Sequence, residues 1–129
     1  MEAGETVDNL PCVTTTILVA DDNRVFAELL RATLEDEGYE VVTASTGLAA
    51  VAAVEHHEVS LAVLDVLMPG ISGDAVAQRL RRIDPDLPVL LMSGSKDGLA
   101  AATGWPVLRK PFPQEALVEE VRRLVGESS

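Results

Sequence analysis

The feature that most constrains the fold is a regular alternation of short apolar runs with segments of helical periodicity. Each run is too short for a buried helix and is bounded by polar or turn-forming residues, as is typical of buried strands. The runs are apolar throughout instead of alternating, which predicts parallel strands covered on both faces. We expect strands over Thr16–Ala20, Glu40–Ala44, Val59–Leu64, Pro88–Met92 and Pro106–Arg109.

Segments with apolar residues at helical spacing follow the expected strands. They are centred on Phe26–Leu34, Leu48–Val54, Ala75–Ile83, Lys96–Thr103 and Leu117–Val125. We expect the apolar stripes of these helices, which include Leu29 and Ile83, to face the core. The fourth helix is expected to be short or irregular, because Gly98 interrupts it and little chain is available there. Strands alternating with helices predict an α/β fold with right-handed crossovers and helices on both faces of the sheet.

Composition restricts the partners that such a domain can have. The 129 residues suffice for one domain, which we place at 15–126 between an N-terminal tail, 1–14, and a C-terminal tail, 127–129. A net charge of −11 disfavours direct contact with nucleic acid or anionic membranes. Cys12 is the only cysteine, which excludes a disulfide framework. Because no segment is typical of an export signal or membrane span, we expect a cytoplasmic protein.

Polar side chains follow the carboxyl ends of four expected strands. Asp21 and Asp22 follow the first, Asp65 the third, Ser93 the fourth and Lys110 the fifth. Taken singly, each is more often a turn, a helix cap or a surface residue. Ligands of open parallel sheets bind outside these ends, however, and three carboxylates gathered there require a compensating cation. Mg²⁺ is the ion that such carboxylates prefer when a phosphate is also bound, and Lys110 supplies further positive charge.

The motifs at these positions resemble those of the receiver domain of two-component response regulators. The resemblance extends from Thr16 to Val125 and implies a flavodoxin-like (βα)5 fold, a three-layer sandwich with strand order 2-1-3-4-5. It rests on Asp21-Asp22-Asn23, on Asp65 with Met68-Pro69-Gly70 and Gly73, on Met92-Ser93-Gly94 and on Lys110-Pro111-Phe112.

The resemblance also implies a role for each site residue. Asp65 would accept a phosphoryl group from a phosphohistidine of a histidine kinase or a histidine phosphotransfer protein, and Ser93 and Lys110 would contact that group. The Mg²⁺ would be held by three carboxylates and one carbonyl: Asp21, Asp22, Asp65 and the backbone carbonyl of Leu67. The protein would then be no enzyme toward another substrate but would catalyse phosphorylation and dephosphorylation of its own aspartate.

Two departures from the family pattern concern signal output. Many receivers carry an aromatic residue three positions before the lysine, where this chain has Val107. Trp105 is close enough in sequence to replace it, but we expect Trp105 to anchor the rim of the core. The limited length of the fourth helix leaves the mode of a possible homodimer open.

The biological setting of the receiver also has alternatives. The sequence around Ser93 and Lys110 is similar to that of receivers attached to hybrid histidine kinases. A stand-alone receiver, a phosphate sink and a relay receiver excised from such a kinase are therefore all open alternatives. A small flavodoxin-like cofactor-binding protein is a rival of another class, but Asp21 and Asp22 would repel its phosphate. We also expect the Lys110–Pro111 peptide to be cis, because the chain must turn sharply there.

Overall fold

The computed structural model describes residues 15–68, 70–94 and 105–126. These residues contain a five-stranded parallel sheet in the order β3-β2-β4-β5-β6. Numbered along the chain, this is the expected order 2-1-3-4-5. The strands are β2 (Thr16–Ala20), β3 (Glu40–Ala44), β4 (Leu61–Asp65), β5 (Val89–Ser93) and β6 (Val107–Arg109).

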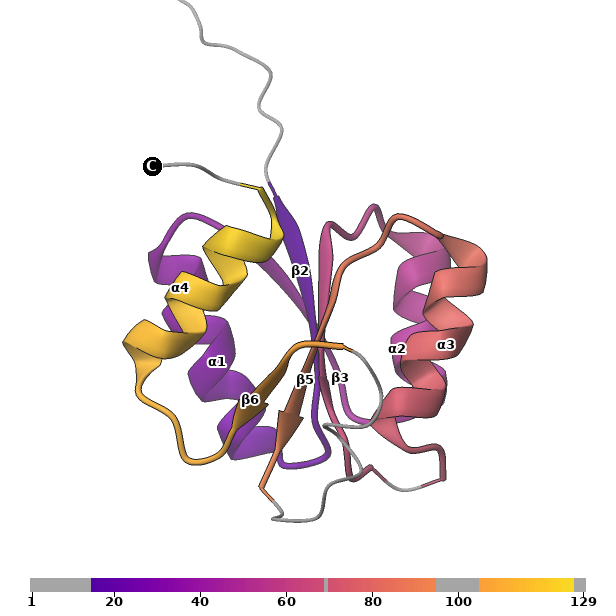
Figure 1. The fold of residues 1–129 in the computed structure, drawn as a ribbon, viewed down its shortest axis with the longest axis horizontal. Helices are drawn as coiled ribbons and strands as arrows, with labels where there is room; N and C mark the ends of the chain where they lie inside the picture. The colour runs from indigo at the N-terminus through magenta and orange to yellow at the C-terminus, as the bar shows by residue number, and fades with distance from the viewer. Residues whose placement is uncertain (1–14, 69, 95–104, 127–129) are drawn as a thin grey trace, which may run out of the picture.

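Helices cover both faces of this sheet. In Figure 1, α1 and α4 lie on one side and α2 and α3 on the other, so the expected flavodoxin-like sandwich is confirmed. The helices are α1 (Arg24–Asp36), α2 (Gly47–His56), α3 (Gly73–Ile83) and α4 (Gln114–Leu124). The helix expected over Lys96–Thr103 lies outside the described residues, as do both predicted tails.

Side chains just before two helices fix where those helices begin. The Oδ1 atom of Asn23 accepts a hydrogen bond from the Phe26 N–H at 3.1 Å, and the Thr46 hydroxyl oxygen accepts one from the Ala49 N–H at 3.1 Å. Each bond satisfies a backbone donor that has no partner within its helix. At most three residues separate these two helices from the strands that precede them, β2 and β3.

The sheet separates two apolar layers. Alternate strand residues point to opposite sides, so Leu18 packs with α2 and α3, whereas Ile17 and Val19 pack with α1 and α4. Strands β4 and β5 are buried at every position, as predicted for central parallel strands. We call these two regions the α2/α3 layer and the α1/α4 layer.

Two residues expected in the core, Leu29 and Ile83, are instead 47% and 41% exposed. Leu29 lies beside the stripe of α1 in which Ala27, Leu30 and Leu34 are buried and Phe26 is partly buried. Ile83 is the last residue of α3 and lies at the amino-terminal edge of the sheet. The expectation for both was wrong because helical periodicity indicates which side of a helix faces the core, but not how many residues beside that line are buried.

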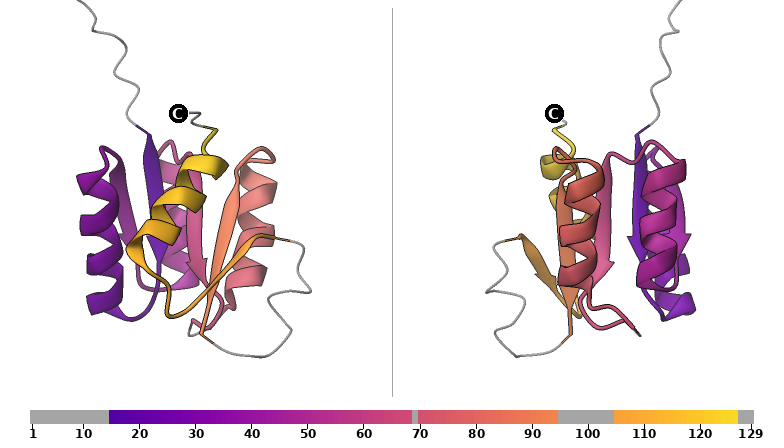
Figure 2. Two further views of the ribbon diagram at one scale, coloured as in Figure 1. Left: turned by 60° about the vertical axis from the view of Figure 1, so that its left-hand side comes forward. Right: turned by 90° about the vertical axis from the view of Figure 1, so that its right-hand side faces the viewer.

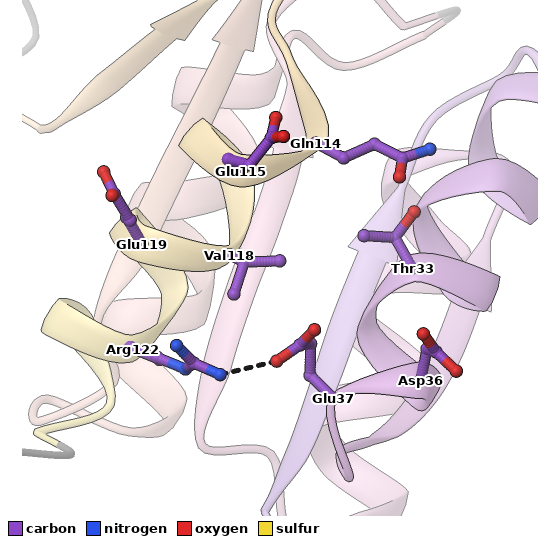
Figure 3. Close-up of a pocket in the computed structure, with 8 residues that line it drawn as sticks. All are labelled: Thr33, Asp36, Glu37, Gln114, Glu115, Val118, Glu119 and Arg122. Atoms are coloured by element: carbon purple, nitrogen blue, oxygen red, sulfur yellow. Dashed lines mark hydrogen bonds and ion pairs between the residues drawn. The ribbon is translucent and has the colours of Figure 1, made fainter. Parts of the chain in front are cut away.

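Helices α1 and α4 lie side by side on their face of the sheet. Figure 3 shows the groove between them, where Arg122 of α4 forms an ion pair with Glu37 directly after α1. Both side chains are partly exposed, so a pair of this kind contributes at most about 1 kcal/mol. The apolar contacts beneath the groove therefore carry most of the packing between these helices.

Gly73 allows α3 to approach the backbone of the strand that carries Asp65. A Cβ atom placed on Gly73 would lie 2.3 Å from the carbonyl oxygen of Asp65 and 2.9 Å from the Cα of Val66. The Gly73 N–H also donates a hydrogen bond to the Val66 carbonyl at 2.9 Å. A side chain here would displace the backbone at the end of β4.

We therefore expect Gly73→Ala to destabilise the fold by about 1–3 kcal/mol, as overpacking against rigid backbone does. Urea denaturation measures the effect. Gly47→Ala is the matched comparison, because Gly47 also begins a helix but its added Cβ would meet side-chain atoms, Val76 Cγ2 at 2.8 Å and Ile71 Cβ at 3.2 Å, with the nearest backbone atom 3.6 Å away. Equal losses of stability in the two variants would contradict this account.

Candidate functional site

The three acidic residues predicted to converge do so at one edge of the sheet. Figure 2 shows that the strand arrows point to the same edge, opposite the edge at which the described chain begins and ends. Carboxylate oxygens of Asp21, Asp22 and Asp65 all lie within 4.8 Å of one another. The carboxyl ends of neighbouring strands β2 and β4 bring them together.

Asp21 is the most firmly held of the three. It directly follows β2, is only 1% exposed, and its N–H donates to the Ala44 carbonyl at 3.0 Å. Its Oδ1 accepts a hydrogen bond from the Asn23 N–H at 2.9 Å, and its Oδ2 accepts one from Lys110 Nζ at 3.0 Å. Asp22 is exposed at the mouth of the cluster.

Asp65 is the last residue of β4 and is 7% exposed. Its Oδ1 accepts a long hydrogen bond from the Leu67 N–H at 3.4 Å, and its Oδ2 lies 3.6 Å from Lys110 Nζ. Burial raises the pKa of the Asp65 carboxyl, and the charge of Asp21 raises it further, whereas Lys110 and the Leu67 N–H act in the opposite direction. Lys110 alone thus does not compensate the charges around it.

The site has more negative than positive charge, as a site for a metal ion requires. Three carboxylates share one ammonium group, and their oxygens are close enough to bind a single ion. Oxygen ligands of this kind suit hard divalent cations. The residues present therefore fit a divalent cation, in agreement with the sequence prediction.

Lys110 reaches this cluster from the chain that follows β6. Its backbone N–H donates to the Ser93 carbonyl at 2.8 Å, which extends the pairing of β5 with β6 by one bond. The Lys110–Pro111 peptide is cis, as predicted. The ammonium group therefore lies beside both Asp21 and Asp65, at the two distances given above.

The remaining predicted residues lie around this centre. Ser93 is buried at the end of β5, and Leu67 follows Asp65 in the next loop with its side chain exposed. Val107 begins β6, and both Val107 and Trp105 are partly buried against the α2/α3 layer. This packing is what the sequence predicted for Trp105 as an anchor at the rim of the core.

Sequence reasoning missed one residue of the site, Phe26. It was assigned only to the apolar stripe of the first helix, yet its ring lies under the Lys110 ammonium, with Nζ 4.4 Å from the ring centroid. The available signal was the scarcity of phenylalanine: the chain has two, of which Phe112 belongs to the motif of Lys110 and Phe26 lies three positions after Asn23 of the first motif.

None of the described helices is both long enough and apolar enough to span a membrane.

Comparison with known sequences identifies the family. Residues 17–122 match the response regulator receiver domain. The probable transcriptional regulatory protein TcrX of Mycobacterium tuberculosis is 38% identical over 115 residues, which are 85% of this chain and 49% of that protein. The transcriptional regulatory protein TctD of Salmonella typhimurium is 37% identical over 118 residues, which are 88% of this chain and 53% of that protein. The chain spans about half the length of these curated relatives.

Solved structures show the same fold. A response regulator receiver protein from Sinorhizobium medicae has a TM-score of 0.83 and 29% identity, with 90% of this chain and 98% of that chain covered. A putative response regulator from Chloroflexus aurantiacus has a TM-score of 0.81 and 31% identity, with 88% and 98% covered. The similarity to hybrid-kinase receivers is not confirmed, since TcrX and TctD are named as transcriptional regulators. With this match spanning most of its length and the acidic cluster at the expected edge of the sheet, the chain belongs to the response regulator receiver domain family.

Proposed function

We propose that this receiver domain is a phosphoacceptor in which Asp65 takes a phosphoryl group from a phosphohistidine in the presence of Mg²⁺. The observation that carries the proposal is the placement of a buried Asp65 beside two further carboxylates and the Lys110 ammonium. A nucleophile, an ion-binding carboxylate pair and a fixed positive charge are the parts that phosphoryl transfer to an aspartate requires.

Each group has a separate task in this proposal. The metal would be held by Asp21, Asp22, Asp65 and the Leu67 carbonyl, and it supplies positive charge for the phosphoryl oxygens. A carboxylate oxygen of Asp65 attacks phosphorus in line, so that an O–P bond forms while the P–N bond to the donor imidazole breaks. Lys110 donates a hydrogen bond to one phosphoryl oxygen, and the Ser93 hydroxyl donates one to another. Later hydrolysis of the acyl phosphate consumes one water molecule, releases inorganic phosphate and returns the Asp65 carboxylate.

The surface around the site supports a protein as the phosphoryl donor. Val25 at the start of α1 and Leu67 after β4 have 81% and 63% of their surface exposed. Both side chains are therefore accessible to another protein. We therefore propose a histidine kinase or a histidine phosphotransfer protein as the partner.

The names of the relatives bear on the output of the domain. TcrX and TctD are about twice as long as the matched region and are named as transcriptional regulators. We propose that contact with DNA, if this system regulates transcription, occurs through a separate domain, because a net charge of −11 opposes direct binding. A relay or phosphate-sink role and a cytoplasmic location stay predictions.

The first test is phosphorylation by a small donor. With Mg²⁺ and acetyl phosphate, intact-mass analysis should show one added phosphoryl group, and peptide mapping should place it on Asp65. Asp65→Asn should abolish the label, and so should a chelator. Asp86→Asn is the matched control, since Asp86 is exposed and precedes β5 at the opposite edge of the sheet. Unchanged labelling of Asp65→Asn would refute the assignment.

A second test concerns stability and pH. Because the folded state raises the pKa of Asp65, the folded protein keeps this proton to a higher pH than the unfolded chain does. The metal-free protein therefore loses stability as the pH rises through the raised pKa. Asp65→Asn should stabilise the metal-free fold at neutral pH by on the order of 1 kcal/mol, and this gain should shrink as the pH falls toward about 4.

Urea denaturation in chelator, at neutral and at acidic pH, measures this difference. Asp22→Asn should have the same sign but stay within about 0.5 kcal/mol, because Asp22 is exposed and contributes least to the shift. Asp86→Asn should show no comparable dependence on pH. If Asp65→Asn proves less stable than the parent at neutral pH, burial and repulsion do not dominate at this carboxyl.

A further inference from the structure

An aromatic ring covers one side of the Lys110 ammonium group. Its Nζ lies 4.4 Å from the centroid of the Phe26 ring, 3.0 Å from Asp21 Oδ2 and 3.6 Å from Asp65 Oδ2. Two carboxylates and one ring face therefore surround the group. The Lys110 side chain is only 24% exposed, so water solvates a small part of it.

The ring itself is held by contacts on two sides. Phe112 meets it edge to face, with ring centroids 5.9 Å apart and planes at 70°. Both rings are partly buried against the α1/α4 layer. The Phe26 N–H is bonded to Asn23 Oδ1, and the Asn23 N–H is bonded to Asp21 Oδ1. The start of α1 thus fixes the ring relative to Asp21.

These contacts link four residues in a ring. Asp21 accepts a hydrogen bond from the Asn23 N–H, and Asn23 accepts one from the Phe26 N–H. The Phe26 ring faces the Lys110 ammonium, which donates a hydrogen bond to Asp21. The four residues connect the turn after β2 to the turn after β6. A lysine with a flexible four-carbon stem is thereby confined to the region in front of Asp65.

The ring contact differs from the two ion pairs in what it permits. A hydrogen bond to Asp21 favours one position of the ammonium, whereas a ring face attracts a cation over a broad area, within about 6 Å of its centroid. An ammonium that turns from Asp21 toward a phosphoryl group on Asp65 can therefore remain over the ring. The ring provides attraction both before and during transfer.

We propose that Phe26 is a positioning residue for phosphoryl transfer, and that the face of its ring keeps the Lys110 ammonium in front of Asp65. This inference rests on the proposed function, because it assigns Phe26 a part in the reaction at Asp65. Phe26 itself touches neither the donor nor phosphorus.

The decisive experiment changes the electron density of the ring and little else. Phenylalanine carrying one, two or three fluorine atoms is introduced at position 26 of the full chain, and the rate of labelling by acetyl phosphate with Mg²⁺ is measured. Fluorine withdraws density from the ring face, so the rate should fall stepwise, by about fivefold with three fluorines. The same residues at position 112 are the matched control and should change the rate by less than about twofold, because Phe112 contacts the Phe26 ring and not its Lys110 face.

A second readout does not depend on phosphorylation. The ε-methylene protons of Lys110 should show an upfield ring-current shift in the NMR spectrum of the metal-free parent. Phe26→Leu, which keeps an apolar side chain, should abolish that shift and slow labelling by about fivefold. Phe112→Leu should retain the shift.

The outcomes separate this inference from the proposed function. If Asp65 of the parent is labelled but fluorination at position 26 leaves the rate unchanged, the ring only packs α1 and the inference is overturned while the function stands. A rate that rises with fluorination also overturns it, because the ring then restrains Lys110. Absence of any label on Asp65 in the parent would overturn both.

Discussion

The bond between Lys110 and Asp21 is the interaction on which the geometry of the site depends. It joins residues that are 89 positions apart in the chain. Strands β4 and β5 lie between β2 and β6 in the sheet, and a strand spacing of about 4.8 Å places the ends of β2 and β6 roughly 14 Å apart. The contact therefore requires both a long side chain and a chain that turns back over the sheet edge after β6.

This bond also makes Asp21 and Lys110 depend on each other for compensation of charge. Asp21 is almost completely buried, and a buried carboxylate without a partner is strongly unfavourable. Lys110 compensates Asp21 at 3.0 Å, which leaves Asp65, at 3.6 Å, as the less compensated group. Burial raises the pKa of the Asp65 carboxyl and the charge of Asp21 raises it further, and Lys110 offsets these effects only in part. The uncompensated negative charge around Asp65 favours binding of a divalent ion, which phosphoryl transfer requires. The same charge lowers the stability of the metal-free fold, so function and metal-free stability place opposite requirements on this residue.

The parts of the structure that follow from local pattern were predictable from sequence, whereas contacts set by tertiary geometry were not. The strands Thr16–Ala20 and Glu40–Ala44 have the predicted bounds, because apolar, β-branched runs between turn residues define both ends. The position of Asp65 at the end of a strand followed from the same pattern. The strand order, in contrast, came from family resemblance, because periodicity does not specify which strands are neighbours. Phe26 was missed because its contact with Lys110 depends on the path of the chain after β6.

The two faces of the sheet are connected to the site in different ways. Val107, at the position that is often aromatic in receivers, packs against the α2/α3 layer. The aromatic residues next to Lys110, Phe26 and Phe112, pack against the α1/α4 layer on the other face. A displacement of the Lys110 ammonium therefore changes contacts of the α1/α4 layer directly, through a ring on α1 and a second ring just before α4. In the described part of this chain, the aromatic contact with the site lies on the face of the sheet opposite Val107.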